Sequence, residues 1–264
     1  MEANQKGGFM MRNICHSDIK RALSSKGFLA GTLGMAMIIS LSLFEGAYSV
    51  LSGGGQLEAG YHVKAILDIL PRDLIILAAP ILCTLPFTTA YVDDMQSGFI
   101  KQFLSRCGVK KYILGKLCAC AISGGLVLSA GILLSYILSG IFLAPMESVV
   151  NSNALATQQI PQLLGRIGMF FFSGAFWSLV GFALASMTNS RYMAYASPFI
   201  VFYVLTILHE RYFNTLYCWY PKEWLNPSAS WMFGNWGVII FLSELTILIS
   251  LGFSFYAGRK LGHE

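Results

Sequence analysis

Long runs of apolar residues, separated by short polar segments, form the main pattern along this chain of 264 residues. A helix needs about 20 consecutive apolar residues to cross the hydrocarbon core of a bilayer. Six runs come close to that length or exceed it, and they cover residues 27–48, 74–92, 117–143, 163–187, 193–208 and 237–256. Pro80 and Pro86 predict a kink in the second run, and Pro198 lies in the short fifth run. The pattern predicts an all-α polytopic membrane protein with about six transmembrane helices.

Composition and charge support this interpretation and orient the chain. Hydrophobic residues make up 55% of the sequence and charged residues 12%, whereas soluble domains have about 25% charged residues. Of the 18 Lys and Arg residues, 13 lie in the N-terminal segment, the loop after the second run, the loop after the fourth, or the C-terminal segment. The positive-inside rule therefore places both termini in the cytoplasm. Topology also explains the net charge of +5, so no nucleic-acid partner is expected.

The connections between the runs are too short for a separate soluble domain. We therefore expect a single transmembrane domain over residues 1–264. The six cysteines are scattered without metal-binding spacing, so neither a metal site nor a disulfide scaffold is expected. His209 and Glu210 do not belong to an HExxH motif, and the pair Asp93–Asp94 has no second acidic cluster to complete a metal–pyrophosphate site.

Residues 11–26 predict an amphipathic helix that lies in the cytoplasmic interface and leads into the first span. Its apolar face consists of Met11, Ile14, Cys15, Ile19, Ala22 and Leu23. Its polar face contains Arg12, Asn13, His16, Lys20 and Arg21. A simple basic anchor without a further role is the alternative for this segment.

Residues 93–116, after the second span, predict a short amphipathic helix in the cytoplasm. Asp93 or Asp94 is expected to cap its start, and Gly108 to end it. Its apolar stripe consists of Met95, Phe99, Ile100, Phe103 and Leu104. A connecting loop has no need of a phenylalanine-rich helix, whereas a groove on a partner protein does. The alternative is a helix that lies on the lipid surface.

This organisation resembles the ABC-2 type permeases, the membrane subunits of one class of ATP-binding-cassette transporters. The topology is similar over the whole chain, but a motif is found only in the 93–116 segment. That motif consists of Asp93 and Asp94, the apolar helix, Arg106, Tyr112, and Gly115 with Lys116. The family usually has a proline before the basic residue, and here Cys107 and Gly108 follow Arg106 instead. The resemblance implies that the helix docks on a cytoplasmic ATPase through Phe99, Phe103, Leu104 and Arg106.

The same resemblance assigns ATP and Mg²⁺ to that partner and no cofactor to this chain. Residues 51–56, Leu-Ser-Gly-Gly-Gly-Gln, come close to an ATPase signature but have one glycine too many and lie in a predicted outer loop. No GxxxxGK[ST] loop that could hold a nucleotide phosphate occurs in the sequence. The chain itself is therefore not expected to be an enzyme.

Two features on the outer side are candidates for the substrate route. Glu45 and Glu244 lie within predicted spans, where a carboxylate is costly unless it faces a polar cavity or a partner. They either line the route or bond to Ser or Thr on a neighbouring span. The 209–236 segment contains seven Tyr and Trp residues and is either an interfacial aromatic belt or, by the resemblance, a set of short re-entrant helices that cap the exit.

The sequence thus predicts the permease subunit of an ATP-driven exporter in a bacterial cell membrane. It would assemble with a second permease subunit and with ABC ATPase subunits. The cargo implied by the resemblance is amphipathic, such as an antimicrobial peptide, a drug or a lipid-like molecule. A stand-alone membrane immunity or sensor protein, without an ATPase, is the alternative.

Overall fold

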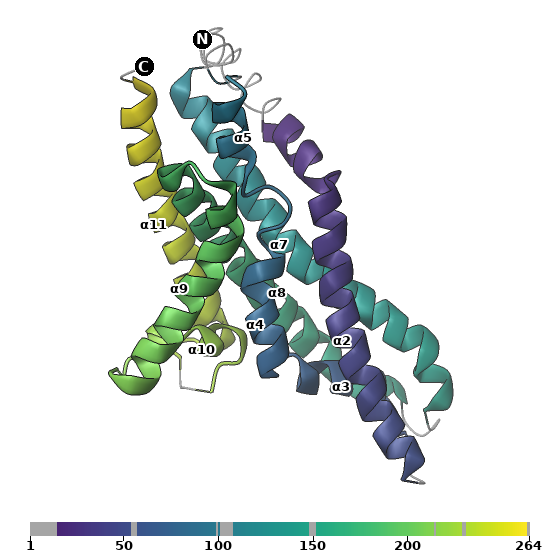
Figure 1. The fold of residues 1–264 in the computed structure, drawn as a ribbon. Helices are drawn as coiled ribbons and strands as arrows, with labels where there is room; N and C mark the ends of the chain where they lie inside the picture. Colours follow the sequence, from purple (N-terminus) through teal and green to yellow (C-terminus); the bar gives the residue numbers. More distant parts are fainter. Residues whose placement is uncertain are drawn as a thin grey trace, which may run out of the picture.

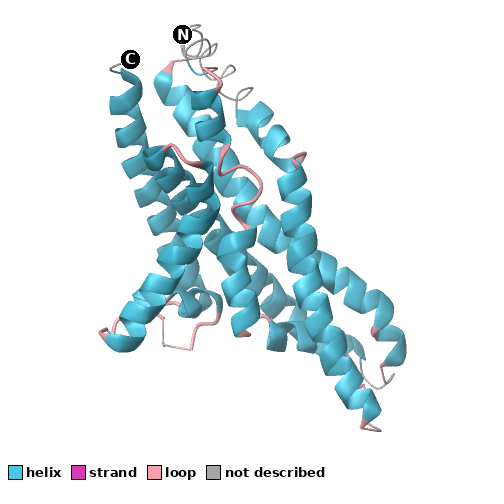
Figure 2. Ribbon diagram, in the orientation of Figure 1, coloured by secondary structure: helices cyan, strands magenta, loops and turns pink. Residues whose placement is uncertain are grey.

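Helices make up the regular structure of the computed structural model, which describes residues 15–53, 57–98, 100, 108–147, 152–213, 215–228 and 231–262. The longer helices are α2 (Lys26–Ser52), α3 (Tyr61–Ile69), α4 (Asp73–Leu82), α5 (Ala90–Gln96), α7 (Val109–Phe142), α8 (Ser152–Thr188), α9 (Arg191–Arg211), α10 (Pro221–Leu225) and α11 (Asn235–Gly262). Residues 15–23 are also helical, and η1 (Ala144–Met146) and η2 (Tyr217–Trp219) are single 3-10 turns. No strand forms among the described residues, which confirms the all-α class (Figure 2).

Five helices are long and apolar enough to cross a membrane. They are α2, α7, α8, α9 and α11, and they coincide with the first, third, fourth, fifth and sixth predicted spans. The fifth is longer than expected, because α9 continues to Arg211 with Pro198 inside it. Gly181 on α8 makes room for this proline, since a Cβ there would lie 2.9 Å from the Pro198 ring.

The second predicted span, 74–92, is not one kinked helix but two short helices joined by turns over residues 83–89. Pro86 causes part of this break, because it lacks an N–H group and disfavours a helical conformation at the residue before it. Thr84 donates a hydrogen bond to the Ile81 carbonyl at 2.7 Å, and Thr88 donates one to the Thr84 carbonyl at 2.5 Å. Figure 1 shows the segment running from the end of the bundle that holds α3 to the opposite end, where α5 lies.

The break is buried against α2. A Cβ at Gly27 would overlap the Leu85 carbonyl oxygen, and one at Gly31 would lie 2.9 Å from the Leu82 oxygen. Non-helical backbone is tolerated at membrane depth only where protein or a water-filled cavity covers it. The two glycines provide that cover, because they let the α2 backbone come into direct contact with the turn.

Helices α7 and α8 cross at the centre of the bundle and hold it together (Figure 1). A Cβ at Gly124 on α7 would overlap the Ser178 hydroxyl, and one at Gly174 on α8 would lie 2.6 Å from the Gly124 oxygen. The Ser178 hydroxyl donates a hydrogen bond to the Cys120 carbonyl at 3.1 Å. Small residues that let backbones approach are typical of helix contacts in membranes, where apolar side chains gain little by leaving lipid.

The helix of residues 15–23, α5, the start of α7 and the end of α11 lie at one end of the bundle (Figure 1). Side chains from all four pack together there, among them Ala22, Tyr91, Tyr112 and Leu261. Helices α3 and α10 lie at the other end.

Replacing Gly124 with alanine should lower the free energy of unfolding by about 1–3 kcal/mol, because the added methyl group overfills the α7–α8 contact. Thermal unfolding in detergent would measure the change. Gly165→Ala on α8 is the matched control, since a Cβ there has no heavy atom within 4 Å. A Gly124→Ala protein that unfolds at the same temperature as the control would contradict this packing.

Candidate functional site

The predicted ATPase-docking residues Phe99, Phe103, Leu104 and Arg106 lie outside the described residues. The residues on both sides of them are described. Asp93 and Asp94 lie inside α5 and do not cap a helix start, so the capping prediction is wrong. Gly108 directly precedes α7 with φ of 74°, a conformation that glycine adopts far more readily than other residues.

Asp94 instead takes part in a buried ionic cluster, which we call the Lys116 cluster: Asp18, Arg21, Asp94, Tyr112 and Lys116. The Lys116 ammonium lies 2.9 Å from Asp94 Oδ2 and 3.0 Å from Asp18 Oδ1. The Tyr112 hydroxyl donates to Asp94 Oδ2 at 2.9 Å. The Lys116 side chain is only 3% exposed and that of Asp94 only 5%. The cluster therefore joins the 15–23 helix, α5 and α7 through charges that water barely reaches.

The cluster is built so that each buried charge has a partner. Arg21 reaches Asp94 Oδ1 at 3.7 Å from a more exposed position. The Lys116 ammonium also lies 5.1 Å from the centre of the Phe87 ring, within the range of a cation–π contact. A buried pair of this kind adds little net stability, but loss of one partner leaves an uncompensated charge and is strongly destabilising.

Two further polar contacts join helix ends on the same side. Asp93 Oδ1 lies 2.7 Å from Arg191 Nε at the start of α9, and Thr89 donates to Asp93 Oδ2 at 3.0 Å. Lys260 near the end of α11 donates to Asn189 Oδ1 at 3.0 Å, just before α9. This end of the bundle is thus connected from the 15–23 helix to α11.

The Lys116 cluster links residues on the two sides of the predicted docking segment. Asp94 precedes the predicted docking segment, whereas Tyr112 and Lys116 follow it. The cluster therefore joins the residues before and after that segment to each other and to the 15–23 helix.

Sequence reasoning found Asp94, Tyr112 and Lys116 as members of a family motif but did not pair them, and it missed Asp18. One signal was available. Asp18 is the only acidic residue in the otherwise basic 11–26 segment. An acid among bases on an interfacial helix indicates a specific cationic partner, because anionic lipid would favour a base at that position.

The predicted route residues Glu45 and Glu244 lie on exposed faces of α2 and α11. Among the described residues neither carboxylate has a hydrogen bond or an ion pair, so the alternative of a Ser or Thr partner is not found in the single chain. Helices α2 and α11 lie on different sides of α7 and α8 (Figure 1). The structure therefore does not bring the two carboxylates into one site.

The outer aromatic segment divides into exposed and buried parts. Tyr212, Trp219 and Trp236 are exposed, as expected of an interfacial belt. Trp224 on α10, in contrast, is fully buried 5.7 Å from the Trp177 ring, and its Nε1 donates to the Cys218 carbonyl at 2.8 Å. The segment therefore inserts one short helix into the core.

Polar contacts hold α10 in this position. Arg166 on α8 donates to the Leu225 carbonyl at 2.8 Å, and Lys222 lies 3.1 Å from Asp73 Oδ1 at the start of α4. Burial is the largest single influence and would lower the pKa of Lys222, but the hydrogen bond to Asp73 and the nearby Tyr220, Asp73 and Glu210 together raise the pKa overall. Lys222 is therefore positively charged at neutral pH and attaches α10 to α4.

No family model, curated protein or solved structure matches this chain. No group of three potential metal ligands occurs among the described residues. The function therefore has to be inferred from the residues of the chain itself.

Lys116→Met should destabilise the protein by about 3–5 kcal/mol, because it leaves the buried carboxylates of Asp18 and Asp94 without their cation. Lys110→Met removes the same charge from an exposed position on α7 and should change stability by less than about 0.5 kcal/mol. Adding Asp18→Asn and Asp94→Asn to Lys116→Met should restore most of the loss. Equal unfolding temperatures for the two single variants would contradict the buried cluster.

Proposed function

We propose that this chain is the transmembrane permease subunit of an ATP-driven ABC exporter. It assembles with a second permease subunit and with cytoplasmic ABC ATPase subunits that bind ATP and Mg²⁺. The observation that supports this most directly is the Lys116 cluster. It joins both flanks of the predicted docking segment to the 15–23 helix through buried ion pairs. A subunit driven by a partner needs such a connection, whereas a passive loop between two spans does not.

The broken 73–96 segment is consistent with a moving part. It contains two short helices and a turn between α3 and the docking segment. Broken helices of this kind are common in transporters, because their ends can move relative to each other while the surrounding helices stay intact. A push on the docking segment would reach α4 through α5 and the 83–89 turn.

The cytoplasmic side in this proposal is the end that holds the 15–23 helix and the end of α11. Lys and Arg are concentrated there, and the positive-inside rule places such segments in the cytoplasm. Helices α3 and α10 would then lie at the outer surface of a bacterial cell membrane. Helix α10, inserted into the core by Trp224, would form part of the cover over the exit.

The cargo in this proposal is amphipathic, such as an antimicrobial peptide, a drug or a lipid-like molecule. Glu45 and Glu244 stand on helix faces that are otherwise largely apolar and exposed in the single chain. A carboxylate in such a position is costly when it faces lipid. A route formed between two permease subunits would give it water or a cationic cargo instead.

Association with an ATPase is the first test. The chain purified in mild detergent from its native cells should bring an ABC ATPase with it, and Phe103→Asp should release that subunit because a carboxylate does not fit an apolar docking groove. Met232→Asp is the control, since Met232 is 79% exposed and shortly precedes α11, which begins at the end of the bundle that holds α10. A wild-type chain that purifies alone would favour the stand-alone immunity or sensor protein.

Glu244→Gln should reduce export without reducing the amount of protein in the membrane, because it removes the charge and keeps the shape. Survival of expressing cells exposed to cationic antimicrobial peptides would report export, and immunoblots of membranes would report abundance. Glu45→Gln tests the other carboxylate in the same way, and Ser243→Ala is a neighbouring control on α11. Unchanged survival of both Glu variants would remove the two carboxylates from the route.

A further inference from the structure

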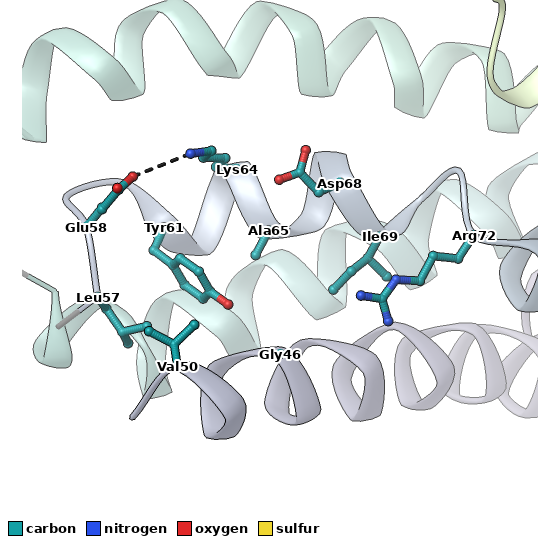
Figure 3. Close-up of a pocket in the computed structure, with 10 residues that line it drawn as sticks. All are labelled: Gly46, Val50, Leu57, Glu58, Tyr61, Lys64, Ala65, Asp68, Ile69 and Arg72. Atoms are coloured by element: carbon teal, nitrogen blue, oxygen red, sulfur yellow. Dashed lines mark hydrogen bonds and ion pairs between the residues drawn. The ribbon is translucent and has the colours of Figure 1, made fainter. Parts of the chain in front are cut away.

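A groove of about 350 Å³ lies between α2 and α3, at the end of the bundle opposite α5 (Figures 1 and 3). Its apolar lining consists of Val50, Leu57, Ala65 and Ile69, together with the ring of Tyr61. Charged side chains from α3 and the residues beside it also line it: Glu58, Lys64, Asp68 and Arg72. The groove therefore has an apolar part and a charged part whose formal charges cancel.

Helix α3 is well suited to form one wall. Its buried face, which includes Val63, Ile66 and Ile69, packs into the core. Lys64 and Asp68 are four residues apart, as are Asp68 and Arg72. Lys64 and Asp68 therefore share one face of α3, whereas Arg72 lies in extended backbone just before α4, with its guanidinium toward α2 (Figure 3).

The start of α3 is held by Glu147, which follows η1 after the end of α7. The Glu147 carboxylate accepts hydrogen bonds from the backbone N–H groups of Gly60 and His62 at 2.9 and 2.7 Å. It also lies 2.7 Å from Nδ1 of His62. Glu147 thus accepts hydrogen bonds from two backbone N–H groups at the start of α3, where a helix leaves such groups without an internal partner. These bonds hold the helix in place as one wall of the groove.

The charges of the groove are available to a ligand. Lys64 and Glu58 form a pair at 3.4 Å, but both are exposed, so the pair is weak. Among the described residues, the guanidinium of Arg72 and the carboxylate of Asp68 have no ion pair or hydrogen bond.

The α2 side offers a place for apolar chains. Val50 and the backbone at Gly46 form the α2 wall of the groove, and Leu57 adds an apolar side chain beside them. Polar headgroups lie at the ends of membrane-crossing helices and acyl chains lie along their sides. A molecule with a polar headgroup and acyl chains could therefore contact α3 and α2 at once.

We propose that this groove binds a zwitterionic phospholipid with a primary amine, such as phosphatidylethanolamine. The phosphate lies against Arg72, whose planar fork of donors matches phosphate oxygens. The ammonium lies against Asp68, and the acyl chains enter along Val50 and the Tyr61 ring in the apolar part of the groove. A quaternary choline headgroup cannot donate to the carboxylate, and an anionic glycerol headgroup gives it no cation. This proposal does not depend on the proposed export function.

Native mass spectrometry would test the site. The purified protein is equilibrated with vesicles of equal parts phosphatidylethanolamine, phosphatidylcholine and phosphatidylglycerol, then extracted, and the retained lipids are counted. The wild type should retain phosphatidylethanolamine in excess. Arg72→Gln should lower that retention about tenfold, as expected for loss of a charged hydrogen bond. Asp68→Asn should remove the preference over phosphatidylcholine.

Arg211→Gln is the matched control, because it removes a positive charge from an exposed position at the same end, outside the groove. It should retain phosphatidylethanolamine as the wild type does. Unfolding temperatures equal to that of the wild type would show that the variants are folded. Retention in proportion to the vesicle composition, or equal retention by Arg72→Gln and Arg211→Gln, would overturn the proposal and indicate nonspecific headgroup contact.

Discussion

Every backbone polar group that enters hydrocarbon has to find a partner within the protein, and this constraint explains most of the fold. Helices meet it with their own hydrogen bonds, which accounts for the five long apolar helices. The 83–89 turn cannot meet it alone. Thr84 and Thr88 bond back to carbonyls there, and α2 covers the turn through Gly27 and Gly31. The unusual closeness of α2 to this segment is therefore a consequence of the break.

A second constraint, the cost of an unpartnered buried charge, organises the end that holds Lys116. The ammonium can be buried there only because Asp18 and Asp94 approach from two other elements. The three elements consequently have to keep their relative positions or expose the cluster to water. This connection is made by charges, whereas α7 and α8 meet through close backbone packing and the hydrogen bond from Ser178 to the Cys120 carbonyl.

The sequence was sufficient to predict the class of fold and the position of the long helices, because span length and apolar composition are properties of single segments. It could not predict that residues 74–92 form two helices. Two prolines indicate a kink, but the extent of a break depends on whether a neighbour such as α2 can cover it. The Lys116 cluster escaped prediction for a similar reason. Asp18 and Lys116 are 98 positions apart, and only the packing of α7 against the 15–23 helix brings them together. The predicted capping role of Asp94 was plausible locally and was overridden by this distant partner.

The exposed carboxylate of Glu244 bears on what covers α11. Its neighbours on the exposed face include Ile240, Ile247 and Leu248, which would be equally well placed against lipid or against another helix. The Glu244 carboxylate is not equally well placed in both, since a charge that faces lipid costs several kcal/mol by most measures. A second copy related by a two-fold axis through this face would bring two such carboxylates together, and they could not both be ionised at close range. A different subunit with a base or hydroxyl at that depth, or a water-filled route, would accommodate the charge without this repulsion. A symmetric homodimer seam centred on Glu244 is therefore the least favourable way to cover this face.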